Sequence, residues 1–268
     1  MKSSFLLLLP FLVASCATLP NPAKVTGSQS DPEATTILRK SAAAHGDPWK
    51  RLRHVKISFD GEWSTLAKRI QPVLTDPDFR KTSIESYRPG RKQVSQTHSG
   101  PGGTKTVERN GDSISVSYNG ATTVDPEKLD AAALVTDAYT IFAFGSSWLS
   151  ENATNLQLLP GRKLDGEPCH LVAGSLKPGI GRASEDHFIA WVSEDTALLK
   201  RFQFTLNGLE STRGADVEVT FLDMKTAPDG TVWPTRFIER LQRPLQIKAH
   251  EWRMTSLSLN GKTVFQGQ

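Results

Sequence analysis

Cys16 is the residue of this chain whose type and surroundings most clearly predict chemistry. It follows the small residues Val13-Ala14-Ser15 and an apolar run over residues 5–12, with the positive charge of Lys2 ahead of them. A basic start, a short apolar segment and small residues before a cleavage point are typical of a secretory signal. The apolar run is too short to cross a bilayer as a helix, which takes about 20 residues. If Cys16 is the first mature residue, its thiol and amine carry acyl chains, and several chains together hold a protein stably on a membrane.

The segment Val13-Ala14-Ser15-Cys16 resembles the lipobox of a bacterial lipoprotein signal peptide. We therefore expect residues 1–15 to be the signal peptide and residues 16–33 to be the lipidated cysteine and a flexible tether rich in Pro, Asn, Ser and Gly. Residues 34–268 are then a single β-rich domain. The alternative is an ordinary signal peptide that is cut a few residues later and discards Cys16.

Composition limits the partners that we expect. Removing 15 signal residues from the 268 of the chain leaves 253, enough for one large all-β domain or two small domains. The formal charge of +4 is mild and the basic residues are spread along the chain, so nucleic acid is not expected as a partner. The expected partner at this point is a membrane, reached through the acyl chains of Cys16. Ala17 stands where a retention signal would resemble Asp, which suggests the periplasmic side of the outer membrane.

Motifs for enzymatic chemistry are weak. Residues 99–106 are glycine-rich like a phosphate-binding loop, but they lack the Gly-Lys-Thr order and lie between two predicted strands. His250-Glu251 begins like a zinc-binding HExxH helix, but Met254 stands where the second histidine is needed. Cys169 and His170 are neighbours on a predicted strand, so they point to opposite faces and cannot form a catalytic pair directly. We expect no catalytic residue, no metal, no cofactor and no enzymatic activity. Catalytic triads also assemble from residues that are distant in sequence, and motif spacing does not reveal those.

The remaining histidines and cysteine have ordinary structural interpretations. Cys169 has no intramolecular disulfide partner once Cys16 is lipidated, so we expect it to be a small buried apolar residue. Positions 185–187 hold Glu, Asp and His, which are metal-ligand types, yet polar residues that open a strand are typical of a solvated loop edge. His45 stands before Gly46 at a predicted helix end, where a cation is favoured.

The pattern of apolar residues predicts one α+β domain dominated by a large antiparallel sheet. Asp31-Pro32-Glu33 caps a helix over residues 34–45, and alternation from Val55 to Phe59 indicates a strand with one covered face. A second helix is expected at residues 127–148. Further strands are predicted over residues 79–87, 92–97, 104–109, 113–118, 156–159, 168–175, 187–192, 198–206, 216–225, 232–240 and 245–257. Twist makes a sheet of so many strands close, split or curl, and interrupting helices could cover the concave face of a curled sheet.

Two stretches of the chain resemble LolA/LolB-like half-barrel proteins. In the first, a predicted helix, Ala44-His45-Gly46 and the strand that follows are similar to the N-terminal signature of that family. The second covers residues 187–257. In it, one predicted hairpin turns at Asp195, and its second strand carries basic and aromatic residues. A further strand pair turns at Asp229-Gly230, and its second strand has a proline near its start. The resemblance implies a curled half-barrel with two or three covering helices, which act as a lid over an apolar cavity. It also implies that the ligand is an acyl chain or another hydrophobic partner, namely a hydrophobic small molecule, a lipid or a lipoprotein. The soluble carrier of that family is not lipidated, and residues 63–67 are the nearest match to the protruding apolar loop of the receptor.

Aromatic and aliphatic residues at alternating strand positions are the candidates for the wall of that cavity. The alternative for each of them is an ordinary core position, which base rates favour. The candidates are Ile57, Phe59, Phe188, Phe202, Phe204, Phe221 and Trp252.

The sequence thus favours a lipid-anchored periplasmic protein that binds an acyl chain, lipid or lipoprotein in a half-barrel cavity, for transport or sorting in the cell envelope. We expect the predicted helix over residues 127–148 to be the lid that opens for exchange. One alternative is a non-enzymatic envelope scaffold whose barrel is filled by side chains and which binds a protein partner. The other is a lipid-acting hydrolase or transferase, which requires a buried polar cluster at the cavity floor.

Overall fold

The computed structural model describes residue 19, residues 29–243 and residues 246–267. The expected signal peptide, Cys16 and most of the expected tether lie outside these described residues. None of the helices in the described ranges is long and apolar enough to cross a membrane.

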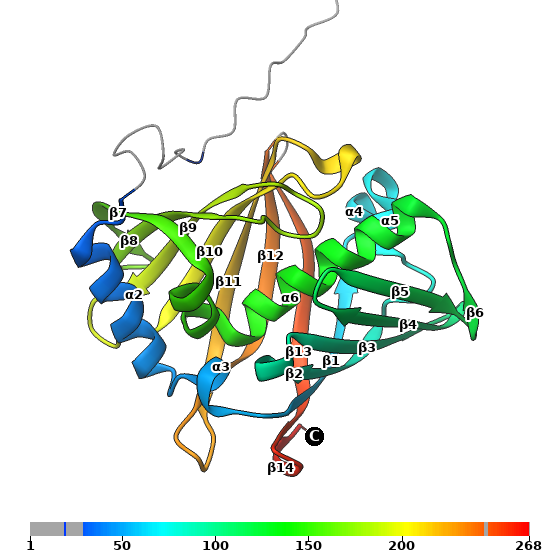
Figure 1. Ribbon diagram of the computed structural model, residues 1–268, viewed down its shortest axis with the longest axis horizontal. Helices are drawn as coiled ribbons and strands as arrows, with labels where there is room; N and C mark the ends of the chain where they lie inside the picture. Colours follow the sequence, from blue (N-terminus) through cyan, green and yellow to red (C-terminus); the bar gives the residue numbers. More distant parts are fainter. Residues whose placement is uncertain (1–18, 20–28, 244–245, 268) are drawn as a thin grey trace, which may run out of the picture.

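One antiparallel sheet of 14 strands forms the body of the protein, in the order β6-β5-β4-β3-β2-β1-β13-β12-β11-β10-β9-β8-β7, with β14 paired to β13. Within the described part of the chain its end strands β6 and β7 do not pair with each other, so the sheet curls without closing (Figure 1). This confirms the predicted α+β half-barrel. The strands are β1 Val55–Trp63, β2 Thr82–Arg88, β3 Gln93–Gly100, β4 Gly103–Asn110, β5 Ser113–Tyr118, β6 Ala121–Thr122, β7 Ala153–Leu164, β8 Glu167–Leu176, β9 Asp186–Ser193, β10 Leu199–Leu206, β11 Ala215–Thr226, β12 Val232–Arg243, β13 Ile247–Leu259 and β14 Lys262–Gln266.

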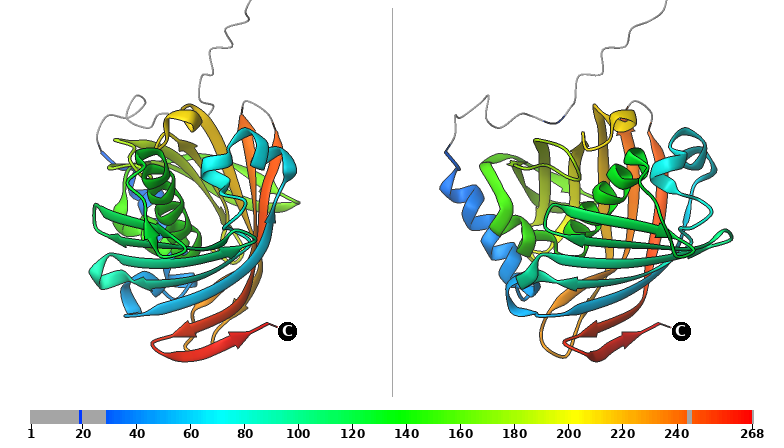
Figure 2. Two further views of the ribbon diagram at one scale, coloured as in Figure 1. Left: turned by 90° about the vertical axis from the view of Figure 1, so that its right-hand side faces the viewer. Right: turned by 45° about the vertical axis from the view of Figure 1, so that its right-hand side comes forward.

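Helices occupy the concave side and the two ends of the curled sheet. Figure 2 shows α6 inside the curve of the sheet, with α2 towards one end and α4 and α5 towards the other. The α-helices are α2 Pro32–Ala44, α3 Pro48–Arg51, α4 Thr65–Ile70, α5 Pro72–Thr75 and α6 Pro126–Asn152, and the short 3-10 helices are η1 Pro89–Arg91 and η2 Glu210–Thr212.

Helix α6 fills the concave face of the sheet. Its N-cap is Asp125, whose carboxylate accepts a hydrogen bond from the backbone N–H of Glu127, and Pro126 occupies the first turn, as expected for a helix start. Buried residues lie on every side of α6 from Ala131 to Leu149, which is typical of a helix inside a core. Gly145 divides the helix with φ 49° and ψ −127°, a conformation that glycine adopts without strain.

Helices α4 and α5 fill the connection between β1 and β2, where the sequence predicts no element. The hydroxyl of Ser64 caps α4 by accepting a hydrogen bond from the N–H of Ala67, and Pro72 begins α5. With 6 and 4 residues these helices are too short to show a helical period of apolar residues.

A separate apolar cluster lies on the convex face of β8 and β9. It contains Cys169, Leu171, Ile189 and Trp191, and the side chain of Leu19 packs against them. Cys169 is buried in this cluster, which confirms its interpretation as a small buried apolar residue.

A candidate binding cavity between helices α4 and α5 and strands β11 to β13

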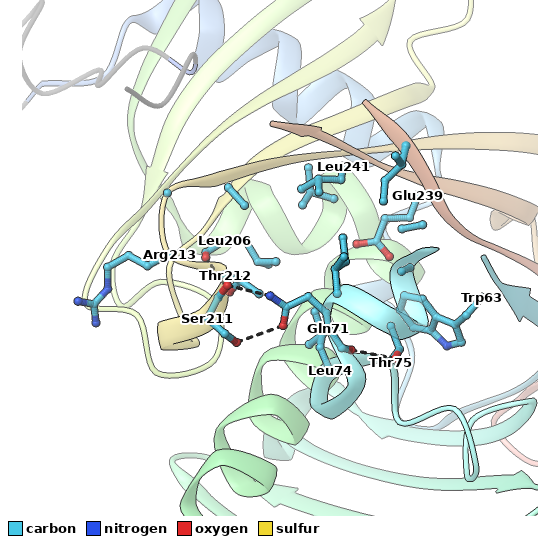
Figure 3. A pocket seen from close by; sticks show the side chains of 17 residues that line it. Trp63, Gln71, Leu74, Thr75, Leu206, Ser211, Thr212, Arg213, Glu239 and Leu241 are labelled. Atoms are coloured by element: carbon cyan, nitrogen blue, oxygen red, sulfur yellow. Dashed lines mark hydrogen bonds between the residues drawn. The ribbon is translucent and has the colours of Figure 1, made fainter. Parts of the chain in front are cut away.

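A cavity of about 470 Å³ lies between α4, α5, the loop that carries η2, and the inner face of β11, β12 and β13 (Figure 3). Its volume falls within the range of about 300–1,000 Å³ that is usual for small-molecule sites. Most of its lining is aliphatic, and the larger aliphatic residues in it are Ile70, Leu74, Leu206, Val217, Leu241 and Ile247. The cavity therefore suits an apolar ligand.

The mouth of the cavity is bridged by two hydrogen bonds between the α4–α5 corner and η2. The side-chain amide of Gln71 donates to the carbonyl oxygen of Ser211 at 2.8 Å, and the hydroxyl of Ser211 donates to the Gln71 amide oxygen at 3.1 Å. Ile70 on α4 lines the cavity and is 43% exposed, and Leu66, one turn earlier on the same helix, is exposed to the same extent. Apolar surface at α4 is therefore continuous with the cavity at Ile70.

A series of four contacting polar side chains begins at the inner end of the cavity with Glu239. Its carboxylate lies 3.1 Å from Nδ1 of His250, the residue opposite it on β13. The other ring nitrogen, Nε2, lies 2.6 Å from the hydroxyl of Tyr139 on α6. Arg80 donates to the same hydroxyl at 2.6 Å and to the carbonyl oxygen of Leu74 at 2.7 Å. These contacts link the cavity to the core through four polar side chains.

Burial determines the protonation states of Glu239, His250 and Tyr139. Desolvation raises the pKa of Glu239 to about 7, although the positive charge of Arg80 opposes the shift. Desolvation, assisted by Arg80, lowers the pKa of His250 well below its ordinary value, so its imidazole is neutral. Desolvation also raises the pKa of Tyr139, which keeps its hydroxyl protonated and makes it a poor nucleophile. The site can hold a proton and accept hydrogen bonds.

We expect Glu239→Gln to change how stability depends on pH. Because the folded pKa of about 7 lies above the ordinary 4.5, the unfolded chain binds fewer protons between these values and wild-type stability falls as pH rises. At about 1.36 kcal/mol per pKa unit the loss is about 3 kcal/mol, and glutamine removes it. Urea unfolding of both proteins from pH 4 to pH 9 measures the difference. Parallel stability curves would contradict the assigned burial of Glu239.

The seven candidates from the sequence lie in the core around α6. All of them are buried, and the described residues that line the cavity do not include them. The ring of Phe142 on α6 packs against Phe204 and Phe221 at centroid distances of 6.0 and 6.4 Å. The ring of Trp252 contacts those of His250 and Tyr139 at centroid distances of 5.7 and 6.3 Å.

Sequence reasoning missed Glu239, although β12 carried a signal for it. Phe237, Glu239 and Leu241 share one face of the strand, and the outer two are apolar. Burying a carboxylate in a row of apolar residues costs free energy. Because such perturbed groups cluster at functional sites, Glu239 marks a candidate site. The part of the lining that α4 and α5 supply carried no comparable signal.

The interpretation of His45 as a cation at a helix end is wrong. His45 is buried, its Nδ1 lies 3.0 Å from the carbonyl oxygen of Val232, and its Nε2 accepts a hydrogen bond from the N–H of Leu199 at 3.0 Å. Burial lowers its pKa, so a neutral ring joins the end of α2 to β10 and β12.

The expected solvated edge at positions 185–187 is also wrong for Asp186. This residue is buried, and its carboxylate accepts hydrogen bonds from the N–H of Ile180 and the hydroxyl of Thr205. These bonds make Asp186 an anchor for the loop before β9.

No protein-family model and no curated protein sequence matches this chain. Solved structures do match it over most of its length. A DUF1329 family protein from Desulfovibrio piger superposes with a TM-score of 0.52 at 12% identity, covering 87% of this chain and 94% of that one. A domain assigned to outer membrane lipoprotein sorting from Vibrio parahaemolyticus gives 0.51 at 9% identity, covering 85% and 92%. A LolA superfamily protein from Nitrosomonas europaea gives 0.50 at 12% identity, covering 85% and 93%. The fold of this chain is therefore the LolA-like half-barrel.

Proposed function

We propose that this protein binds the apolar part of an amphiphile, such as an acyl chain, a lipid or a lipoprotein, in the cavity between α4, α5 and β11 to β13. The observation that carries the proposal is the aliphatic lining of a cavity of about 470 Å³. Binding gains about 25 cal/mol for each Å² of apolar surface removed from water, or about 0.8 kcal/mol for each buried CH₂ group. The role is non-enzymatic: the protein binds and releases its ligand without changing it.

We place this activity at the bacterial cell envelope, with the protein anchored through Cys16 and facing the periplasm from the outer membrane. The support is the lipobox-like segment that ends at Cys16, which lies outside the described residues, and the fold shared with a domain assigned to outer membrane lipoprotein sorting. The anchor leaves the cavity free to exchange ligand with the membrane surface or with other envelope proteins.

Exchange through α4 and α5 fits the packing better than the movement of α6. Helix α6 is buried on all sides from Ala131 to Leu149, so its displacement exposes a large part of the core to water at high cost. Helices α4 and α5 are short, carry the exposed Leu66 and Ile70, and are held to η2 at the mouth by the hydrogen bonds between Gln71 and Ser211. Local opening is easiest in segments with few buried contacts.

The filled concave face supports a second candidate function. Because α6 and the aromatic residues around Phe142 occupy the space enclosed by the sheet, an envelope scaffold that binds a protein partner needs no ligand in the barrel. The two functions differ in whether the domain binds apolar molecules at all.

Competition for a fluorescent probe tests the proposal. The chain from residue 16 onward, carrying Cys16→Ser so that no acyl group is attached, is titrated with an environment-sensitive naphthalene probe. We expect saturable binding, and displacement by a phospholipid and by a diacylated peptide. Failure of the probe and of both competitors to bind would favour the scaffold.

A further inference from the structure

We propose that the cavity selects ligands whose buried end carries a hydrogen-bond donor, a hydroxyl or an amine, and disfavours ligands that bring a carboxylate to that position. The inference rests on the proposed function, and it names the chemical class of the ligand. It follows from Glu239 and from the scarcity of other charges at the inner end of the cavity.

The carboxylate of Glu239 faces the cavity. Figure 3 shows its oxygens pointing into the space between the strands and the α4–α5 corner. Only 14% of the side chain is exposed, and its neighbours on the same face of β12 are Phe237 and Leu241. A ligand in the cavity therefore meets this carboxylate in a nearly apolar surrounding.

Glu239 has acceptor positions to spare. A carboxylate offers about four lone-pair sites, and His250 is the only side chain in the described ranges within ion-pairing distance of it. The 3.1 Å contact between Glu239 and Nδ1 of His250 does not have hydrogen-bond geometry, and Nδ1 has no other partner among the described atoms. A ligand that donates a hydrogen bond to Glu239 therefore gives this partly buried carboxylate an additional partner.

The nearby cations do not offer an anionic ligand a partner in the cavity. Arg80 is not a lining residue of the cavity and is 2% exposed. Its guanidinium donates to Leu74 and Tyr139 and lies 4.8 Å from the centroid of the Trp63 ring. Arg213 is in the lining but pairs with Glu210 at 2.6 Å. Two carboxylates brought together in a buried site cannot both stay ionised, so an anionic ligand end is disfavoured beside Glu239.

Three ligands with a twelve-carbon chain differ in their polar end and so test its effect on affinity: dodecylamine, dodecanol and dodecanoate. Calorimetric titration at pH 8.5, below the micelle concentration, uses the chain from residue 16 onward with Cys16→Ser. We expect the amine and the alcohol to bind at least tenfold more tightly than the carboxylate, which corresponds to about 1.4 kcal/mol. In Glu239→Gln the three affinities should fall within about threefold of one another.

Glu62→Gln is the matched control, because it removes the same charge from an exposed position on β1 outside the cavity, and it should keep the wild-type order. Wild-type binding of dodecanoate as tight as that of dodecylamine would overturn the inference without any variant. Equal affinities for all three ligands would overturn this inference but not the proposed function, since the apolar part of the ligand would still bind. Failure of all three to bind overturns the proposed function with it.

Discussion

Replacing Ala215 with tryptophan should reduce the affinity for an apolar ligand by at least about 100-fold. Ala215 is the first residue of β11, is half-buried and lines the cavity. An indole at this position takes up space that the ligand needs, and 100-fold corresponds to about 2.7 kcal/mol, similar to the burial of one large aliphatic side chain. Because Ala215 borders open space, the variant should unfold close to the wild-type temperature. Probe titration and thermal unfolding measure the two effects.

Ser115→Trp is the matched control for this experiment. It adds the same side chain at an exposed position of β5, away from the cavity lining, and it should leave affinity unchanged. If Ala215→Trp binds the probe as well as the wild type does, the ligand occupies another part of the molecule and the assignment of the cavity is wrong.

The second large effect is expected at Phe202, where alanine should lower the free energy of unfolding by about 3–5 kcal/mol. Phe202 is fully buried, and its ring packs against Phe188 and Phe204 at 5.6 and 5.2 Å. The cost combines the lost transfer free energy of the ring with the space left behind. Because Phe202 is absent from the cavity lining, ligand affinity of the folded variant should change less than about threefold. Urea unfolding and probe titration give both numbers.

Phe265→Ala provides the comparison. Phe265 on β14 is only partly buried, so its replacement should lower the free energy of unfolding by clearly less than Phe202→Ala does. A large loss of affinity in a folded Phe202→Ala protein would mean that the ligand reaches the aromatic core, as the sequence alone suggested. In that case α6, and not the α4–α5 corner, is the element that moves.

Local patterns were enough to predict most of the fold. Alternation from Val55 to Phe59 placed β1, and Asp31-Pro32-Glu33 placed the start of α2. These signals are local, because strand alternation and helix capping depend on residues a few positions apart.

The cavity depends on contacts that no local pattern encodes. Alternation shows that Phe202 faces the inside of the sheet, but not whether it meets α6 or open space, since that depends on where residues 126–152 pack. The wall formed by α4 and α5 comes from helices too short to have a period. Glu239 was detectable only as a polar exception in an apolar row, and its contact with His250 required the register of β12 and β13.

Native mass spectrometry tests the central claim most directly. The chain from residue 16 onward with Cys16→Ser is purified from bacterial cells, and the mass released on denaturation is compared with that from Ala215→Trp. We predict a co-purified amphiphile in the former and its loss in the latter. A clean unliganded mass that stays unchanged after incubation with phospholipids and a lipopeptide would contradict a ligand-binding cavity and favour a scaffold that binds a protein partner.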